Sequence, residues 1–244
     1  MPGTPLDADD LSGDLELSIQ AGAAREGRDG TVEVVINSSR GEIPGVLHPR
    51  EGEPGAAVFV GGALGGLDGP AGGLYPRLAQ ALAAPEEASG LTSLRLNYRQ
   101  PGEFQECVLD VLGGLSFLKG IGARRVALVG HSFGAAVAIK AGELSEQVVG
   151  VAALSSQLHG TRSVERLAPK SVLLVHGSAD SILDCAASRD IYDRALEPKR
   201  LVLYEGAGHS LAQCADELFE LLQAWLVEVV AEAEAEAEAE AEDS

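Results

Sequence analysis

A short glycine and serine motif follows an apolar run near the middle of the 244-residue chain. Residues 126–129 (Val-Ala-Leu-Val) predict a buried strand, and Gly130, Ser132 and Gly134 follow as Gly-His-Ser-Phe-Gly. A strand that passes through Gly-x-Ser-x-Gly into a helix forms a nucleophile elbow, which exposes the serine hydroxyl above the sheet edge. The glycines leave room for strand and helix to pass each other. We therefore predict Ser132 as a nucleophile.

A serine hydroxyl becomes a good nucleophile only beside a base, and a histidine base needs a carboxylate to orient it. His209 follows three small residues in a glycine-rich loop at 206–209, between a predicted strand and the last helix. Asp180 follows another predicted strand in the run His-Gly-Ser-Ala-Asp. Asp184 is the second choice for the carboxylate, but it is better placed to cap the next helix. The sequence thus predicts a triad of Ser132, Asp180 and His209.

The elements that must position these side chains alternate between strand and helix along the chain. Most predicted strands are apolar throughout, which is typical of a parallel sheet covered by helices on both faces. We expect an α/β fold with a mainly parallel, doubly covered sheet of eight strands, at residues 31–36, 45–48, 56–60, 92–97, 126–129, 148–154, 171–175 and 200–204. The carboxyl ends of such strands line the ligand crevice, and each motif above falls at such an end.

The chain resembles the α/β-hydrolase superfamily over residues 31–230, because it holds the elbow, the aspartate and the Gly-x-Gly-His loop in the order Ser, Asp, His. It is similar to the small esterase, thioesterase and dienelactone-hydrolase-like branches, although dienelactone hydrolases carry cysteine where this chain has serine. The elbow predicts one oxyanion donor, the backbone N–H of Phe133. The resemblance implies a second N–H from Ala63, with Leu64 as the alternative, and Gly61 stands where the superfamily often has histidine.

The connector between the strand that follows the elbow helix and the aspartate strand is short. It spans residues 155–170, too few for the helical cap domain that lipases insert there. We therefore expect no cap domain and a small or exposed acyl substrate. The predicted function is a serine hydrolase that cleaves esters or thioesters through an acyl-enzyme, with no cofactor and no metal. Two alternatives stay open: an acyltransferase on the same scaffold, and a non-enzymatic binding protein that keeps the fold.

Charge and hydropathy restrict the partners. The net charge of −19 argues against nucleic acid, because phosphate binding needs a basic face. No apolar run reaches the length of a membrane span, and the N-terminus lacks the pattern of a signal peptide, so we expect a cytoplasmic protein without a membrane partner. The predicted organisation is a mobile acidic segment at 1–30 that holds at most a short strand at residues 15–19, the hydrolase domain at 31–230 and an acidic Ala/Glu tail at 231–244. The tail is expected to be a frayed helical extension or disordered. No sequence feature indicates an oligomeric state.

Three further polar residues near the motifs have plainer interpretations. His131, inside the elbow, is expected to pack beside Ser132, and His176 to serve as a structural hydrogen-bonding group. Arg99 follows a strand and could contact an anionic substrate, but a structural ion pair is the favoured interpretation.

Overall fold

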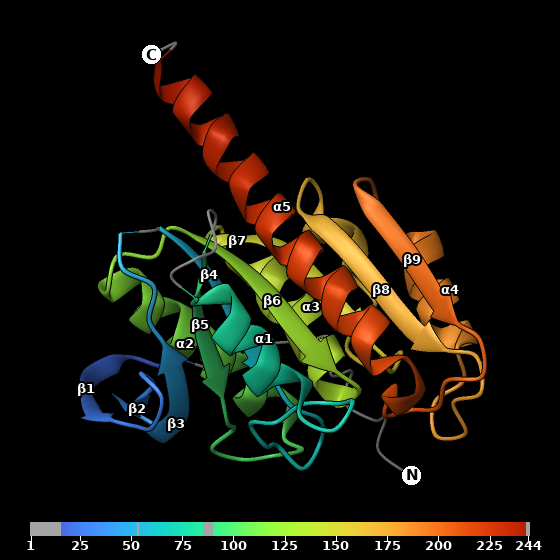
Figure 1. The fold of residues 1–244 in the computed structure, drawn as a ribbon, viewed down its shortest axis with the longest axis horizontal. Coiled ribbons are helices and arrows are strands. Elements are labelled where there is room, and N and C mark those ends of the chain that lie inside the picture. Colours follow the sequence, from blue (N-terminus) through green and yellow to red (C-terminus); the bar gives the residue numbers. More distant parts are fainter. Residues whose placement is uncertain (1–15, 53, 85–89, 243–244) are drawn as a thin grey trace, which may run out of the picture.

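One twisted sheet forms the centre of the molecule in the computed structural model, which describes residues 16–52, 54–84 and 90–242 (Figure 1). Within these residues the sheet has nine strands. In spatial order they are β1 (Ile19–Glu26), β2 (Val32–Ser38), β3 (Gly41–His48), β5 (Thr92–Leu96), β4 (Gly55–Val60), β6 (Arg125–His131), β7 (Val148–Leu154), β8 (Ser171–Gly177) and β9 (Lys199–Tyr204).

The strands from β5 to β9 in this order run parallel, whereas β1, β2 and β3 form an antiparallel extension that joins β5. The chain runs from β4 outward to β5 on one side, and later returns to place β6 on the other side of β4. This reversal is a topological switch point, where loops leave adjacent strands in opposite directions and open a crevice. The loops that follow β4 and β6 therefore flank the expected binding edge.

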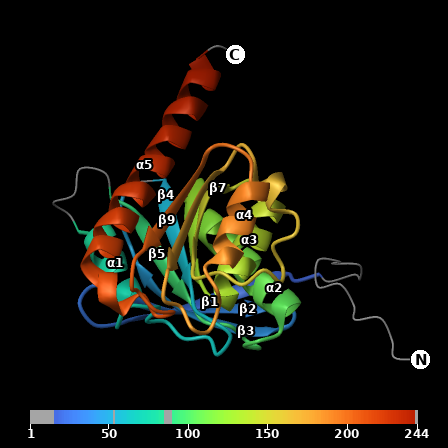
Figure 2. The same cartoon turned by 90° about the vertical axis from the view of Figure 1, so that its right-hand side faces the viewer.

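Helices cover both faces of the sheet, as the unbroken apolar strands predict (Figure 2). They are α1 (Leu74–Leu82), α2 (Phe104–Gly120), α3 (Phe133–Leu144), α4 (Ala186–Arg194) and α5 (Ala215–Glu242), with short 3-10 helices at Val164–Leu167 and Ala212–Cys214. Side chains of α2, α3 and α4 share one buried cluster, and those of α1 and α5 share the other.

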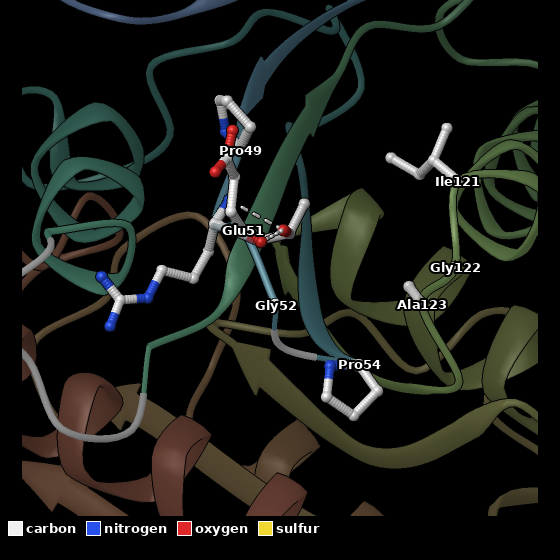
Figure 3. Close-up of a pocket in the computed structure, with 9 residues that line it drawn as sticks. Pro49, Glu51, Gly52, Pro54, Ile121, Gly122 and Ala123 are labelled. Atoms are coloured by element: carbon white, nitrogen blue, oxygen red, sulfur yellow. Dashed lines mark hydrogen bonds between the residues drawn. The ribbon is translucent and has the colours of Figure 1, made fainter.

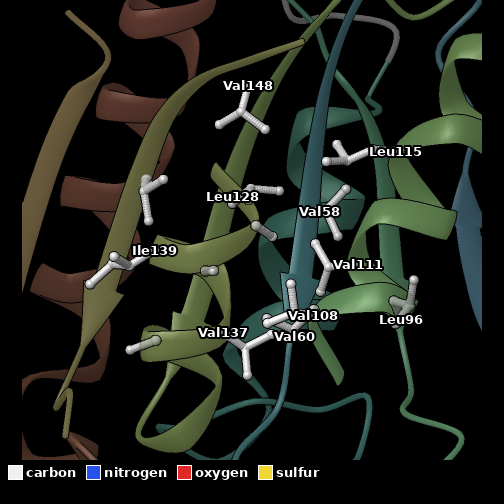
Figure 4. Close-up of a cluster of buried hydrophobic side chains, with 14 of the residues drawn as sticks. Val58, Val60, Leu96, Val108, Val111, Leu115, Leu128, Val137, Ile139 and Val148 are labelled. Carbon is white, nitrogen blue, oxygen red and sulfur yellow. The ribbon is translucent and has the colours of Figure 1, made fainter. Parts of the chain in front are cut away.

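The two clusters alternate along each central strand, since successive side chains point to opposite faces. In β4, Val58 faces α2 and α3, whereas Phe59 faces α1 and α5. In β6, Leu128 likewise faces α2 and α3, whereas Val129 faces α1 and α5. Figure 4 shows the first cluster, where the strand side chains meet the helical side chains Val108, Val111, Leu115, Val137 and Ile139. Burial on both faces holds the carboxyl ends of the central strands in place.

The predicted α/β architecture is confirmed, but the predicted number of strands is wrong by one. The additional strand is β1, which pairs with β2 inside the segment at 1–30 that we expected to be mobile apart from a short strand at residues 15–19. Seven of its eight residues are exposed, so the sequence carries no alternating apolar pattern there. Residues 1–15 lie outside the described part of the chain.

Helix α5 extends through the acidic tail as far as Glu242. The described part of the tail is therefore a helical extension, one of the two states that we expected. The end of α5 projects beyond the sheet in Figure 1. Its last buried apolar residues are Val229 and Val230, close to the predicted domain limit at 230. None of the described helices is both long enough and apolar enough to cross a membrane.

Candidate active site

Ser132 occupies a strained turn between β6 and α3. Its φ of 59° and ψ of −118° are unusual for a residue with a side chain. A Cβ atom at Gly130 would lie 2.1 Å from the carbonyl oxygen of Gly134, and one at Gly134 would lie 2.1 Å from that of Gly61. Only glycine fits at either position, as the elbow motif predicts. The surrounding packing therefore holds the serine in a conformation that costs about 1–3 kcal/mol.

The structure brings the three residues of the predicted triad into one hydrogen-bonded chain. Ser132 Oγ lies 3.0 Å from His209 Nε2, and His209 Nδ1 lies 2.7 Å from Asp180 Oδ2. The three side chains come from the carboxyl ends of β6, β8 and β9, which explains how residues far apart in the sequence meet. Nδ1–H donates to the carboxylate, so the lone pair of Nε2 faces the serine hydroxyl. This arrangement lets the imidazole accept the serine proton.

Four donors surround the buried carboxylate of Asp180. Oδ1 accepts the backbone amides of Ile182 (2.8 Å) and Leu183 (2.9 Å), and Oδ2 accepts His209 Nδ1 and His176 Nε2 (3.1 Å). Burial opposes ionisation of Asp180, but the Leu183 amide, His209 and the Ile182 amide outweigh it, so its pKa lies below the usual value. The group is therefore a carboxylate at neutral pH.

His176 has the structural role expected from the sequence, and it also contacts the triad directly. Its Nε2–H is shared between Asp180 Oδ2 and the carbonyl of Leu183 at 2.9 Å, while Nδ1 accepts the hydroxyl of Ser188 at 2.7 Å. The side chain is fully buried. The contact with Asp180 was not predicted, because the His-Gly-Ser-Ala-Asp spacing does not reveal which way the loop folds back.

Asp184 and Arg99 have structural contacts and do not join the predicted triad. Asp184 Oδ1 accepts the backbone amide of Ala186, the first residue of α4, at 2.8 Å. The side chain of Arg99 is 4% exposed and forms ion pairs with Asp110 and Glu106, which leaves its guanidinium group away from solvent. The interpretation of Arg99 as a structural ion pair is confirmed.

The loop after β4 forms a tight turn beside the nucleophile. The amide of Gly65 donates to the carbonyl of Gly62 at 2.9 Å, which places Ala63 and Leu64 at the corner. A Cβ at Gly62 would lie 3.9 Å from Ser132 Cβ. Among the described residues, the amides of Ala63, Leu64 and Phe133 have no hydrogen-bond acceptor. These amides are therefore available to donate to an oxyanion. Ala63 and Leu64 both remain candidates for the second oxyanion donor.

Two residues after β5 hold this turn, and the sequence did not single them out for this role. Tyr98 donates its hydroxyl to the carbonyl of Gly61 (3.2 Å), and Asn97 Oδ1 accepts the amide of Gly66 (2.9 Å). A Cβ at Gly61 would lie 2.6 Å from the Gly65 carbonyl, so the turn folds directly over this position. The histidine often found there in the superfamily would not fit this turn.

The buried His48 and the partly buried His131 predict a pH dependence of stability. Burial lowers the pKa of His131 to about 4, and burial and Arg95 lower that of His48 to about 4. A histidine in the unfolded chain titrates at about 6.5, so between pH 6.5 and 4 the unfolded chain binds more protons. We expect the free energy of unfolding to fall as the pH drops through this window, by about 1 kcal/mol per pH unit for His131. Urea unfolding between pH 7.5 and 5 measures this slope.

The control for this expectation is a pair of variants, His131→Gln and His48→Gln, which cannot be protonated. Each is expected to show a shallower slope than the wild-type chain between pH 6.5 and 5. If the wild type is equally stable at pH 7 and pH 5, or both variants keep its slope, the histidines are not the cause.

The pocket in Figure 3 lies at the amino ends of the central strands. It is lined by residues next to the starts of β4, β5 and β6, including Pro54, Thr92 and Ala123. The predicted triad lies at the other ends of the strands, so this pocket is separate from the candidate active site.

The sheet order, the helices on both faces and the strained serine turn define the α/β-hydrolase fold. The form is lidless, because the connection from β7 to β8 holds only the 3-10 helix Val164–Leu167. The sequence model of the phospholipase/carboxylesterase family matches residues 112–224, which include Ser132, Asp180 and His209. Together, fold and match indicate a hydrolase. A search of curated proteins finds no match.

Several solved structures share this fold. Est1E from Butyrivibrio proteoclasticus aligns with a TM-score of 0.69 at 14% identity, covering 82% of this chain and 99% of that protein. A dienelactone hydrolase from Anabaena variabilis aligns with a TM-score of 0.69 at 17% identity, covering 85% and 99%. XC6422 from Xanthomonas campestris, described as a serine hydrolase without lid, aligns with a TM-score of 0.65 at 19% identity, covering 82% and 94%.

Proposed function

We propose that the protein is a serine hydrolase that cleaves carboxylic esters or thioesters through an acyl-enzyme. The observation that carries this proposal is the continuous hydrogen-bonded chain from Ser132 through His209 to Asp180. The lidless fold and the match to a phospholipase/carboxylesterase family support it. So do the similar structures described as a dienelactone hydrolase and a serine hydrolase.

In the acylation step, His209 Nε2 takes the proton of Ser132 as the hydroxyl oxygen attacks the substrate carbonyl. Asp180, ionised at neutral pH, stabilises the imidazolium that forms. The same imidazolium then gives its proton to the departing alcohol or thiol. Water hydrolyses the acyl-enzyme with His209 again as the base, which restores the serine.

The tetrahedral intermediates carry a negative oxygen that needs donors in place before the reaction. We assign this role to the amides of Phe133 and Ala63, which have no other acceptor in the described part of the chain. Donors positioned in this way stabilise the transition state more than the ground state. The open edge of the sheet, without a cap domain, favours a small or exposed acyl group.

The direct test is labelling of the wild-type protein with a fluorophosphonate, followed by mass spectrometry to locate the adduct. Hydrolysis of p-nitrophenyl esters and of acyl thioesters is measured in parallel. We expect an adduct on Ser132 and turnover of at least one ester class. An unlabelled Ser132 with no turnover would favour the binding-protein alternative. Transfer to an added alcohol in preference to water would favour an acyltransferase.

The assignment of Ala63 predicts a loss of activity in Ala63→Pro. Proline removes the amide hydrogen and is favoured at the second position of a turn, the position that Ala63 occupies between Gly62 and Gly65. We expect kcat to fall about 100-fold, the usual cost of one oxyanion donor, with a smaller change in KM. Steady-state kinetics on a p-nitrophenyl ester measures both.

The matched control is Ala63→Ser, which keeps the amide at the same corner of the turn. It is expected to retain most of the wild-type kcat. If Ala63→Pro folds and retains full activity, the second donor lies elsewhere, and Leu64 becomes the remaining candidate in the turn.

A further inference from the structure

The backbone carbonyl of His209 accepts two side-chain hydrogen bonds. His131 Nε2 lies 2.9 Å from this oxygen, and Ser155 Oγ donates to it at 3.1 Å. A carbonyl oxygen can only accept, so Nε2 of His131 carries the hydrogen. The two donors come from different strands, because His131 ends β6 and Ser155 follows β7. The residue predicted as the base is thus tied to the sheet at its own carbonyl, in addition to the contact of its ring with Asp180.

The loop that carries His209 needs such an anchor. It includes Gly206, with a φ of 72°, and Gly208, so its backbone has more freedom than average. Neighbouring positions are held by other contacts: the Gly206 amide by Ser178 Oγ (2.9 Å), and the Gly208 amide by Gln213 Oε1 (3.1 Å). At His209 itself, the backbone contacts found among the described residues are those from His131 and Ser155.

Ser155 is itself held in an unusual conformation. It is fully buried and has a φ of 45°, a value that side-chain-bearing residues rarely adopt. Its amide donates to the carbonyl of Val175 at 2.8 Å, which fixes the residue between β7 and β8. Buried strain of this kind is concentrated at functional sites. The strain therefore fits a residue that aims its hydroxyl at one particular acceptor.

His131 is suited to act as an uncharged donor. The centres of its ring and that of His209 are 4.9 Å apart, at 52°. A positive charge at this distance would oppose the imidazolium that His209 must form. Burial lowers the pKa of His131 to about 4, so its ring is neutral at neutral pH and still donates through Nε2–H.

We propose that His131 and Ser155 are positioning residues for His209, which hold its carbonyl so that Nε2 stays in reach of Ser132. This inference rests on the proposed function, since it assigns to the two residues a role in the reaction that Ser132 and His209 carry out. Neither side chain needs to touch the substrate. Because a misplacement of about 1 Å can cost about 100-fold in rate, loss of either anchor is expected to reduce turnover.

The experiment compares His131→Leu, His131→Gln, Ser155→Ala and the double variant His131→Leu/Ser155→Ala. Leucine removes the donor, whereas the amide nitrogen of glutamine can occupy the place of Nε2. Each variant is assayed for kcat and KM on a p-nitrophenyl ester, and active sites are counted by fluorophosphonate titration. Urea unfolding identifies the folded fraction. The exposed His159, replaced by leucine, is the matched histidine control.

We expect kcat per titrated site to fall about 30-fold in His131→Leu, about fivefold in Ser155→Ala and at least 100-fold in the double variant, with KM changed less than about threefold. His131→Gln should recover most of the loss. A purely structural role would instead lower the folded fraction and leave kcat per site unchanged, and that result would overturn the inference. So would equal losses in the leucine and glutamine variants.

The wild-type measurement separates this inference from the proposed function. If the wild type neither reacts with the fluorophosphonate nor turns over an ester, the proposed function fails and the inference fails with it. If the wild type is active and folded His131→Leu and Ser155→Ala match it, only the positioning roles are wrong.

Discussion

Ser132→Ala is expected to reduce ester hydrolysis by a factor on the order of 10⁵ and to abolish fluorophosphonate labelling. Alanine leaves the elbow backbone in place but removes the oxygen that would attack the substrate carbonyl. Without that oxygen no acyl-enzyme forms, and His209, which Asp180 orients, has no serine proton to accept. Purified wild-type and variant proteins are compared at saturating p-nitrophenyl ester and by mass spectrometry after labelling.

The matched control for this variant is Ser116→Ala, at an exposed position near the C-terminal end of α2. It is expected to keep the wild-type rate and labelling. Equal urea midpoints for Ser132→Ala and the wild type would show that the fold survives. Hydrolysis by Ser132→Ala at the wild-type rate would mean that the activity belongs to another residue or to a contaminant.

Asp180→Asn is expected to lower kcat by about 10⁴-fold near neutral pH. The carboxylate accepts four hydrogen bonds, two on each oxygen. An asparagine amide must turn its NH₂ group toward one of these pairs of donors. If that group faces His209, the imidazole can keep the contact only with its hydrogen moved to Nε2, which can then no longer accept the serine proton. Steady-state kinetics at pH 7.5 measures the loss.

Asp184→Asn is the control, because asparagine keeps a side-chain oxygen that can accept the amide of Ala186, as Asp184 does. Its kcat is expected to equal that of the wild type. The two aspartates were the competing choices for the carboxylate in the sequence, so this pair also tests that choice. A large loss in Asp184→Asn with little effect in Asp180→Asn would reverse the assignment.

The sequence was sufficient to predict that Ser132, Asp180 and His209 would lie close together. Each follows an apolar strand, and parallel strands bring their carboxyl ends to one edge of a sheet. The glycines at 130 and 134 identified the elbow, because a tight crossing of strand and helix excludes a side chain at both positions. These signals are local in the sequence and follow directly from backbone geometry.

The prediction of eight strands missed β1, for a physical reason. This strand lies at the edge of the sheet with most of its residues exposed, so no alternation of apolar and polar residues marks it. Its pairing is made through backbone hydrogen bonds to β2, and those depend little on which side chains are present. An edge strand of this kind is therefore difficult to recognise from composition and periodicity.

Residue types and spacing alone were enough to predict the α/β fold, the lidless form and the order of the three residues that would carry the chemistry. The groups that hold these residues became visible in the folded chain: His176 contacts Asp180, Tyr98 contacts the loop of Ala63, and His131 and Ser155 contact the carbonyl of His209. Three of these contacts join segments at the ends of different strands, and the contact of His176 with Asp180 depends on how the loop after β8 folds back. A hydrogen bond forms only when both partners lie at the right distance and angle. Strand order and loop path set that distance, and the spacing of residues within one segment does not reveal either of them.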